Sequence, residues 1–176
     1  MGLVKNKALV KKVVIGAIVR DTQVMRALSN DKSDFLDSSY PDNSIEENME
    51  LLDTRIFDRR APETLENEAK SIVSIGASVH KSEFPRARGL IQINTLVHES
   101  LMKTDYSLKR NDYLLHKLET MLEGALPNQI ITRMEAEDTK EYDRSGEFVR
   151  DSITFSFDII NLSKACERMG VKLDDT

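Results

Sequence analysis

The chain has 176 residues, a formal net charge of −5 at neutral pH and 31% charged residues. That length supports one domain with a sizeable core, and the acidic balance argues against a general nucleic-acid binder, which needs a basic stripe. The single cysteine, Cys166, excludes an intramolecular disulfide and a cysteine zinc cluster. The longest apolar stretch near the N-terminus, Val13–Val19, is too short to cross a bilayer, so we expect no signal peptide and no membrane association.

The N-terminal segment carries apolar side chains at helical spacing, broken only at Asp21. This pattern predicts a long amphipathic helix over Lys5–Ser29. The polar segment Asn30–Asn43 predicts a loop or an extended arm. Ser44 and Glu47 form a capping-box pattern, which predicts that a short helix begins there.

Three segments alternate apolar and polar residues, which predicts strands with one face in a core and the other toward water. They are Ser71–His80, Leu90–His98 and Ile153–Ile159. The first two form a hairpin whose connection of about ten residues is longer than a tight turn. That connection carries Arg86 and Arg88. In the third strand, one face is expected to lie in the core: Ile153, Phe155, Phe157 and Ile159.

A helix is predicted between the hairpin and the last strand. It begins after the candidate N-cap Ser107 and stops at Gly124. Gln129–Met134 predicts a short strand, and Glu135–Glu147 is the most charged stretch of the chain, which is typical of a solvated loop. A short helix is predicted around Ser163–Met169.

This order of elements predicts an α+β fold: an antiparallel β-sheet of about four strands with helices packed on one face, preceded by a long N-terminal helix. The predicted units are the N-terminal amphipathic helix (1–30), a polar arm or linker (31–43), the α+β domain (44–162), and a short C-terminal helix with a tail (163–176).

No segment matches a nucleotide-binding, nucleophile-elbow or metalloprotease motif. His80, His98 and Glu99 form a weak set of metal ligands, which we interpret as ordinary polar residues at strand ends. Cys166 is interpreted as a structural residue rather than a nucleophile. The sequence therefore predicts no catalytic residue, no metal and no cofactor, and it predicts that the protein is not an enzyme.

Several segments, taken in order, resemble a known family. Leu52–Phe57 leads into a proline-containing turn, the hairpin continues into His98–Met102, Arg110–Leu114 opens the following helix, and Asp151–Ile160 is the final strand. Over about Leu51–Asn161 the chain resembles the small tail terminator and head–tail joining proteins of long-tailed bacteriophages. The predicted N-terminal helix and the polar arm lie outside this resemblance.

The resemblance implies a structural virion protein that performs no chemistry. It implies a homo-oligomeric ring, usually of six subunits, at the head-proximal end of the tail, which stops polymerisation of the tail tube and joins the tail to the neck. The implied partners are other copies of the chain, the tail-tube protein and neck or connector proteins, while genomic DNA passes through the lumen without sequence-specific binding. The implied location is the virion, after assembly in the host cytoplasm.

Other functions are compatible with the residues themselves. Within the same class, the protein would be a head-side connector or a tail completion protein of the neck. A nuclease or another small enzyme on an α+β sheet would need clustered carboxylates that bind a metal. A regulatory protein-binding module would use the first helix to dimerise or to bind a partner.

Charged residues on the hairpin, at the start of the helix and in the charged loop are the expected contacts with another subunit or a tail component. Strand edges and long hairpin arms supply pairing between subunits. An arginine in the first turn of a helix opposes the helix dipole, so Arg110 is expected to have a carboxylate partner. The expected interface residues are Arg86, Arg88, Arg110, Asp112, Glu137, Asp138 and Glu141.

Overall fold

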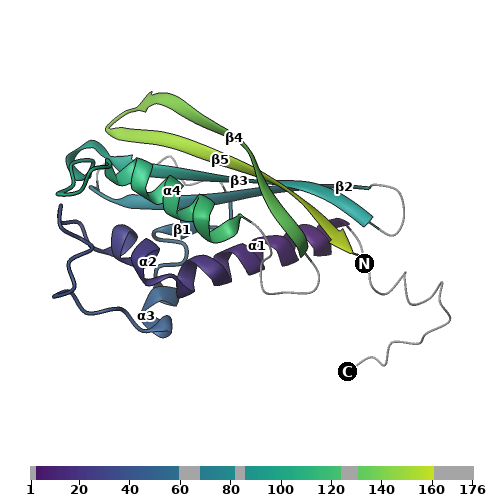
Figure 1. Ribbon diagram of the computed structural model, residues 1–176, viewed down its shortest axis with the longest axis horizontal. Helices are drawn as coiled ribbons and strands as arrows, with labels where there is room; N and C mark the ends of the chain where they lie inside the picture. The colour runs from purple at the N-terminus through teal and green to yellow at the C-terminus, as the bar shows by residue number, and fades with distance from the viewer. Residues whose placement is uncertain (1–2, 60–67, 82–85, 124–130, 161–176) are drawn as a thin grey trace.

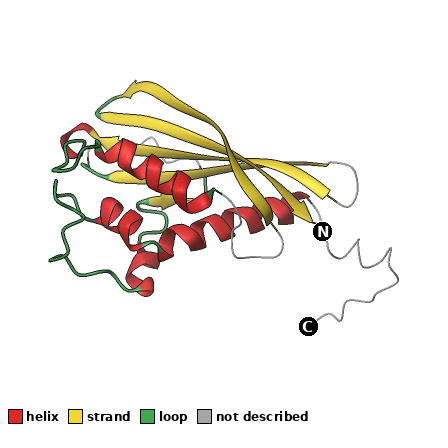
Figure 2. Ribbon diagram, in the orientation of Figure 1, coloured by secondary structure: helices red, strands yellow, loops and turns green. Residues whose placement is uncertain are grey.

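The computed structural model describes residues 3–59, 68–81, 86–123 and 131–160. Its frame is one five-stranded β-sheet, and the helices that pack against it lie on one face (Figures 1 and 2). The fold is α+β, which confirms the class predicted from the sequence.

The strands are β1 (Ile56–Phe57), β2 (Ser71–Lys81), β3 (Arg86–His98), β4 (Ile131–Ser145) and β5 (Phe148–Ile160). Their spatial order is β1-β2-β3-β5-β4. Neighbouring strands are antiparallel except β1 and β2, which run parallel. The sheet thus has five strands rather than about four, and β1 departs from the predicted antiparallel pairing. The long connection between β1 and β2 lets the chain return in the same direction, as parallel strands require.

The helices are α1 (Leu3–Arg20), α2 (Thr22–Ser29), α3 (Ile45–Glu50) and α4 (Arg110–Leu122), with one 3-10 turn at Glu99–Leu101. Helix α1 packs along β2, and α4 packs across β3 and β5. Helix α2 bridges the two, because it contacts α1, α4 and β2. The N-terminal helices therefore belong to the layer that covers the sheet (Figure 1).

Asp21 divides the predicted single helix over Lys5–Ser29 into α1 and α2. Its backbone is extended, and its carboxylate accepts hydrogen bonds from the backbone N–H groups of Gln23 and Val24, at 3.0 and 2.9 Å. Asp21 is therefore an N-cap, which satisfies N–H groups that a helix start leaves without partners. The break in the apolar stripe at this residue marks a helix boundary rather than a defect within one helix.

One core joins the N-terminal helices to the sheet. Val10, Val14 and Ile18 form a fully buried stripe on α1. They belong to the same buried cluster as Ile153, Phe155 and Phe157 of β5. The predicted inward face of the last strand is confirmed at these three residues, whereas the side chain of Ile159 lies outside the described residues.

The charged segment predicted as a loop is most of strand β4, which runs on to Ser145. It pairs with β5 along its length, with three shifts of register, and Gly146 (φ +61°) lies in the turn between the two strands. Strand β4 is an edge strand, and its side chains over residues 137–141 are exposed, so polar residues are tolerated on both faces there. The predicted short strand Gln129–Met134 overlaps the start of β4, where Met134 is buried, but the sequence pattern did not predict that the strand continues through the charged segment.

Smaller differences concern helix ends. The capping box of Ser44 and Glu47 is present at the start of α3, as predicted. Helix α4 begins at Arg110, and its N-cap is Lys109 rather than Ser107. The predicted end at Gly124 and the predicted helix at Ser163–Met169 lie outside the described residues.

Candidate functional site

Arg110 is fully buried, although it was expected at an interface. Its guanidinium donates hydrogen bonds to the backbone carbonyls of Leu101, Ala27, Asn30 and Lys32. Two of these carbonyls lie at the C-terminal end of α2, where the helix dipole favours a positive charge. The expected carboxylate partner is therefore wrong: among the described residues, the hydrogen bonds of Arg110 go to carbonyl oxygens. The described hydrogen bonds of Arg110 therefore all lie inside its own subunit, where its side chain is fully buried.

The electrostatic setting of Arg110 keeps it charged. Burial lowers the pKa of its guanidinium to about 10, and the nearby carboxylate of Asp31 opposes that shift. The side chain is therefore still protonated at neutral pH. It also lies over the ring of Phe35, with 4.4 Å from the guanidinium carbon to the ring centroid, which is a cation–π contact.

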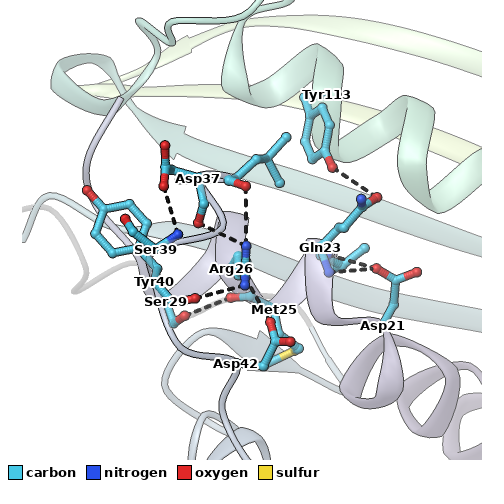
Figure 3. A network of polar contacts seen from close by, with 12 residues as sticks. Asp21, Gln23, Met25, Arg26, Ser29, Asp37, Ser39, Tyr40, Asp42 and Tyr113 are labelled. Carbon is cyan, nitrogen blue, oxygen red and sulfur yellow. Dashed lines mark hydrogen bonds and ion pairs between the residues drawn. The ribbon is translucent and has the colours of Figure 1, made fainter. Parts of the chain in front are cut away.

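The predicted polar arm, residues 30–43, is held against the body of the protein. Arg26 of α2 donates to the carbonyls of Leu36, Asp37 and Tyr40 and pairs with the carboxylate of Asp42 at 2.8 Å. Figure 3 shows Arg26 at the centre of these contacts.

Phe35 anchors the same arm in the core. Its ring is fully buried and meets Tyr106 and Tyr113 edge to face, with both centroids at 5.4 Å. The arm is thus an ordered loop rather than a linker that reaches out.

An open groove of about 540 Å³ lies between α4 and the β4 side of the sheet. Two of the predicted interface residues, Asp112 on α4 and Glu141 on β4, both line this groove. Apolar side chains and further charged ones complete the lining: Leu115, His116, Glu119, Thr139, Lys140, Asp151 and Ile153.

A buried polar chain supports one wall of this groove. Asn111 donates to the Asp151 carboxylate, and its own side-chain oxygen accepts from the hydroxyl of Thr95. Asp151 is only 5% exposed. Burial, followed by the charges of Glu141 and Asp112, raises the pKa of the Asp151 carboxyl. Sequence reasoning missed this residue, because nothing in the strand pattern tells a buried aspartate from a solvated one.

Glu137 and Asp138 lie on β4 outside the groove. Glu137 contacts the hydroxyl of Ser156, and Asp138 pairs with Lys140 at 3.3 Å. Both carboxylates are exposed. They belong to the outer strand of the sheet, a position that makes them accessible to a neighbouring molecule.

The predicted basic residues of the hairpin lie elsewhere. Arg88 is opposite His80 in the register of β2 and β3, and its side chain is 76% exposed. Its guanidinium lies 3.7 Å from the carboxylate of Asp158 on β5. Arg86 is paired with Ile160 in the register, and its side chain lies outside the described residues.

A polar network that the sequence did not predict covers part of the face opposite the helices. Arg150 donates to the side-chain oxygen of Asn94 at 2.9 Å and lies over the ring of Tyr142. The Tyr142 hydroxyl is bonded to Ser152 and Gln92, and the hydrogen bond with Ser152 lowers the pKa of the tyrosine most. This network links β4 to β5 and β3.

The fold places His80 and His98 far apart along the hairpin. His80 and His98 lie at opposite ends of the β2–β3 hairpin, because His80 pairs with Arg88 near the turn. His98 contacts Glu147 and Ser100 instead, at 2.8 and 2.7 Å. In the described ranges, no group of three histidine, cysteine or acidic residues is arranged to hold a metal ion.

A family model described as YomW matches residues 21–156. The match begins at Asp21, the residue that separates α1 from α2, and ends within β5. A search of curated proteins found no match. No helix within the part of the chain that the structure describes is long and apolar enough to cross a membrane.

Proposed function

The chain belongs to the YomW family of phage-related proteins, and from that premise we propose that it is a structural protein of the phage particle. In this proposal it forms a homo-oligomeric ring at the head-proximal end of the tail. The ring stops polymerisation of the tail tube, joins the tail to the neck and carries out no chemical reaction.

The observation that carries this proposal is that the two outer sides of the sheet differ. On one side, β4 presents a long edge rich in carboxylates. On the other, β1 pairs only with Val73 and Ser74, so within the described residues Ile75–Lys81 of β2 has β3 on its inner side and no strand on its outer side. Exposed backbone N–H and C=O groups on such edges can pair with another chain. Two unlike surfaces on one subunit favour a head-to-tail contact, which closes into a ring when the rotation allows.

The charge distribution suits a ring through which DNA passes. The net charge is −5, and the carboxylates of β4 are exposed. A phosphate backbone is repelled by such a surface and slides past it without binding. Tail-tube and neck proteins are the proposed partners on the two rims of the ring. A head-side connector or a tail completion protein would use the same ring with different neighbours.

A protein-binding module is the second candidate, and a specific observation favours it. Ile45 and Met49, one turn apart on α3, are 56% and 49% exposed. These two apolar side chains of α3 therefore face solvent. An exposed apolar pair of this kind, flanked by Glu46 and Glu50, suits a contact with a partner protein.

Mass in solution separates these candidates. Light scattering should give a multiple of the 20.0 kDa subunit mass, and electron microscopy should show closed rings. Added to polymerising tail-tube protein, the rings should cap the tubes and shorten them. Variant Ile45→Ser/Met49→Ser is the control, because it removes the α3 contact without touching the sheet edges. A chain that stays monomeric at high concentration and in the presence of tail tubes contradicts the ring.

A further inference from the structure

We propose that the groove between α4 and β4 of one copy receives the basic end of the β2–β3 hairpin of a neighbouring copy. This inference rests on the proposed ring and names the surfaces that would close it. The groove supplies a negatively charged surface, and the hairpin supplies Arg88, whose side chain is 76% exposed.

The groove is a gap in the helical layer. Helix α4 packs against β3 and β5, whereas Thr139 and Glu141 of β4, which line the groove, are exposed. Leu115 and Ile153 give the groove an apolar lining beneath its charged rim. Polar rims around apolar floors are typical of surfaces that bind another protein.

The rim carries more negative charge than it can neutralise. Among the described residues, Asp112, Glu119 and Glu141 form no ion pair. Lys140, the one cationic side chain of the lining besides His116, pairs with Asp138 instead. The pKa of the neighbouring Asp151 carboxyl is raised by burial and, next, by the negative charges of Glu141 and Asp112. A cationic partner would relieve this repulsion.

The hairpin end has the complementary charge. Lys81, Arg86 and Arg88 lie at the ends of β2 and β3 that meet at the connection. Arg88 is largely exposed, and its contact with Asp158 is long, at 3.7 Å. Arginine is suited to this role, because its guanidinium binds carboxylates with two parallel hydrogen bonds.

The two surfaces are far apart in one copy. Figure 1 shows the connected end of β2 and β3 at one end of the sheet and α4 over the other half. The groove is lined by residues of α4, so it lies with that half. A contact between them must therefore join two copies. It is head-to-tail, because each copy uses a different surface on either side, and repetition of that contact closes a ring.

Helix α1 is the other basic segment, and the described contacts disfavour it as the occupant. It packs along β2 through its buried stripe, and Lys11 is bonded to the carbonyl of Asp58. Lys12 on its exposed side serves as the matched control.

Reversal of charge tests the pairing. Arg88→Glu and Glu141→Lys, each alone, should weaken assembly about tenfold or more, measured as the concentration at which rings dissociate, because like charges then face each other. The double variant Arg88→Glu/Glu141→Lys should restore assembly to nearly the level of the parent. Lys12→Glu, at an exposed position on α1, should leave assembly unchanged.

The outcomes distinguish this inference from the ring itself. Rings that form normally in both single variants overturn the inference and leave the proposed function standing. The inference is also overturned, and the proposed function still stands, if the double variant melts at the temperature of the parent but does not regain ring assembly. Rescue of Glu141→Lys by Lys12→Glu would identify α1 as the occupant and overturn the hairpin. A parent chain that forms no ring overturns the proposed function and this inference together.

Discussion

Two charged regions of this protein use their charges in opposite ways. Around the ordered arm at residues 30–43, two arginines are surrounded by backbone carbonyls of their own subunit. Along β4 and the groove beside it, carboxylates face solvent with few cations near them. The first region holds the subunit together, and the second leaves charge available to a neighbour. A charged residue in the sequence therefore reveals little until its surroundings are known.

The largest difference between the regions is expected at Arg110. Arg110→Met keeps much of the side-chain volume but leaves four buried or half-buried carbonyls without their donor. The free energy of unfolding should fall by about 4 kcal/mol in denaturant titrations, because buried polar groups without partners are costly. Arg88→Met, at an exposed position, is the matched control and should change stability by less than about 0.5 kcal/mol. If Arg110→Met and Arg88→Met lose the same free energy of unfolding, the buried arginine contributes no more to stability than the exposed one, and this contrast between the two regions is wrong.

Arg26 should show a smaller effect of the same kind. Arg26→Ala removes its bonds to three carbonyls of the arm and its ion pair with Asp42. We expect a loss of about 2 kcal/mol, because water can reach some of the carbonyls that are left. Hydrogen exchange should show the added opening in residues 30–43 and not in β4. Unchanged protection of the arm would mean that Phe35 holds it without Arg26.

The groove should respond to pH through Asp151. Because its pKa is raised in the folded protein, the folded state binds that proton more tightly than the unfolded chain does. Its contribution to stability is present at low pH and is lost as the pH rises through the raised pKa. Relative to Asp151→Asn, which cannot titrate, the stability of the parent should fall between the ordinary aspartate pKa of about 3.9 and neutral pH. Melts of both proteins across that pH range would measure this. A stability difference between parent and Asp151→Asn that does not change with pH would contradict the raised pKa of Asp151.

The smallest effect on stability is expected at the exposed carboxylates of β4. Replacement of Glu137, Asp138 and Glu141 by serine should change the free energy of unfolding by less than about 0.5 kcal/mol. Assembly should change, and its dependence on salt should weaken, because exposed charges are screened within about 3 Å at 1 M salt. Asp42→Ser is the matched control, since it removes the partner of Arg26 and should lower stability without altering assembly. Identical assembly of triple variant and parent at every salt concentration would exclude this strand as a binding surface.

Sequence patterns predicted the elements that have one face in the core. The strands predicted at β2, β3 and β5 and the helix predicted at α4 are confirmed, because burial on one side imposes a period that a sequence displays. Asp112 and Glu141 were also identified as candidate contacts, and the structure places them in one groove. Their proximity was not predictable, since it depends on how α4 crosses the sheet.

The sequence by itself determined the α+β class, the hairpin, the capping box of α3 and the inward face of β5. Only the tertiary structure decided that β4 continues through the charged segment to Ser145, because its hydrogen bonds come from β5 and no apolar alternation marks the exposed part of this edge strand. It also decided that Arg110 is buried and Arg88 exposed. The two arginines are chemically identical, and they differ because carbonyls from distant segments converge on the first and leave the second at the surface.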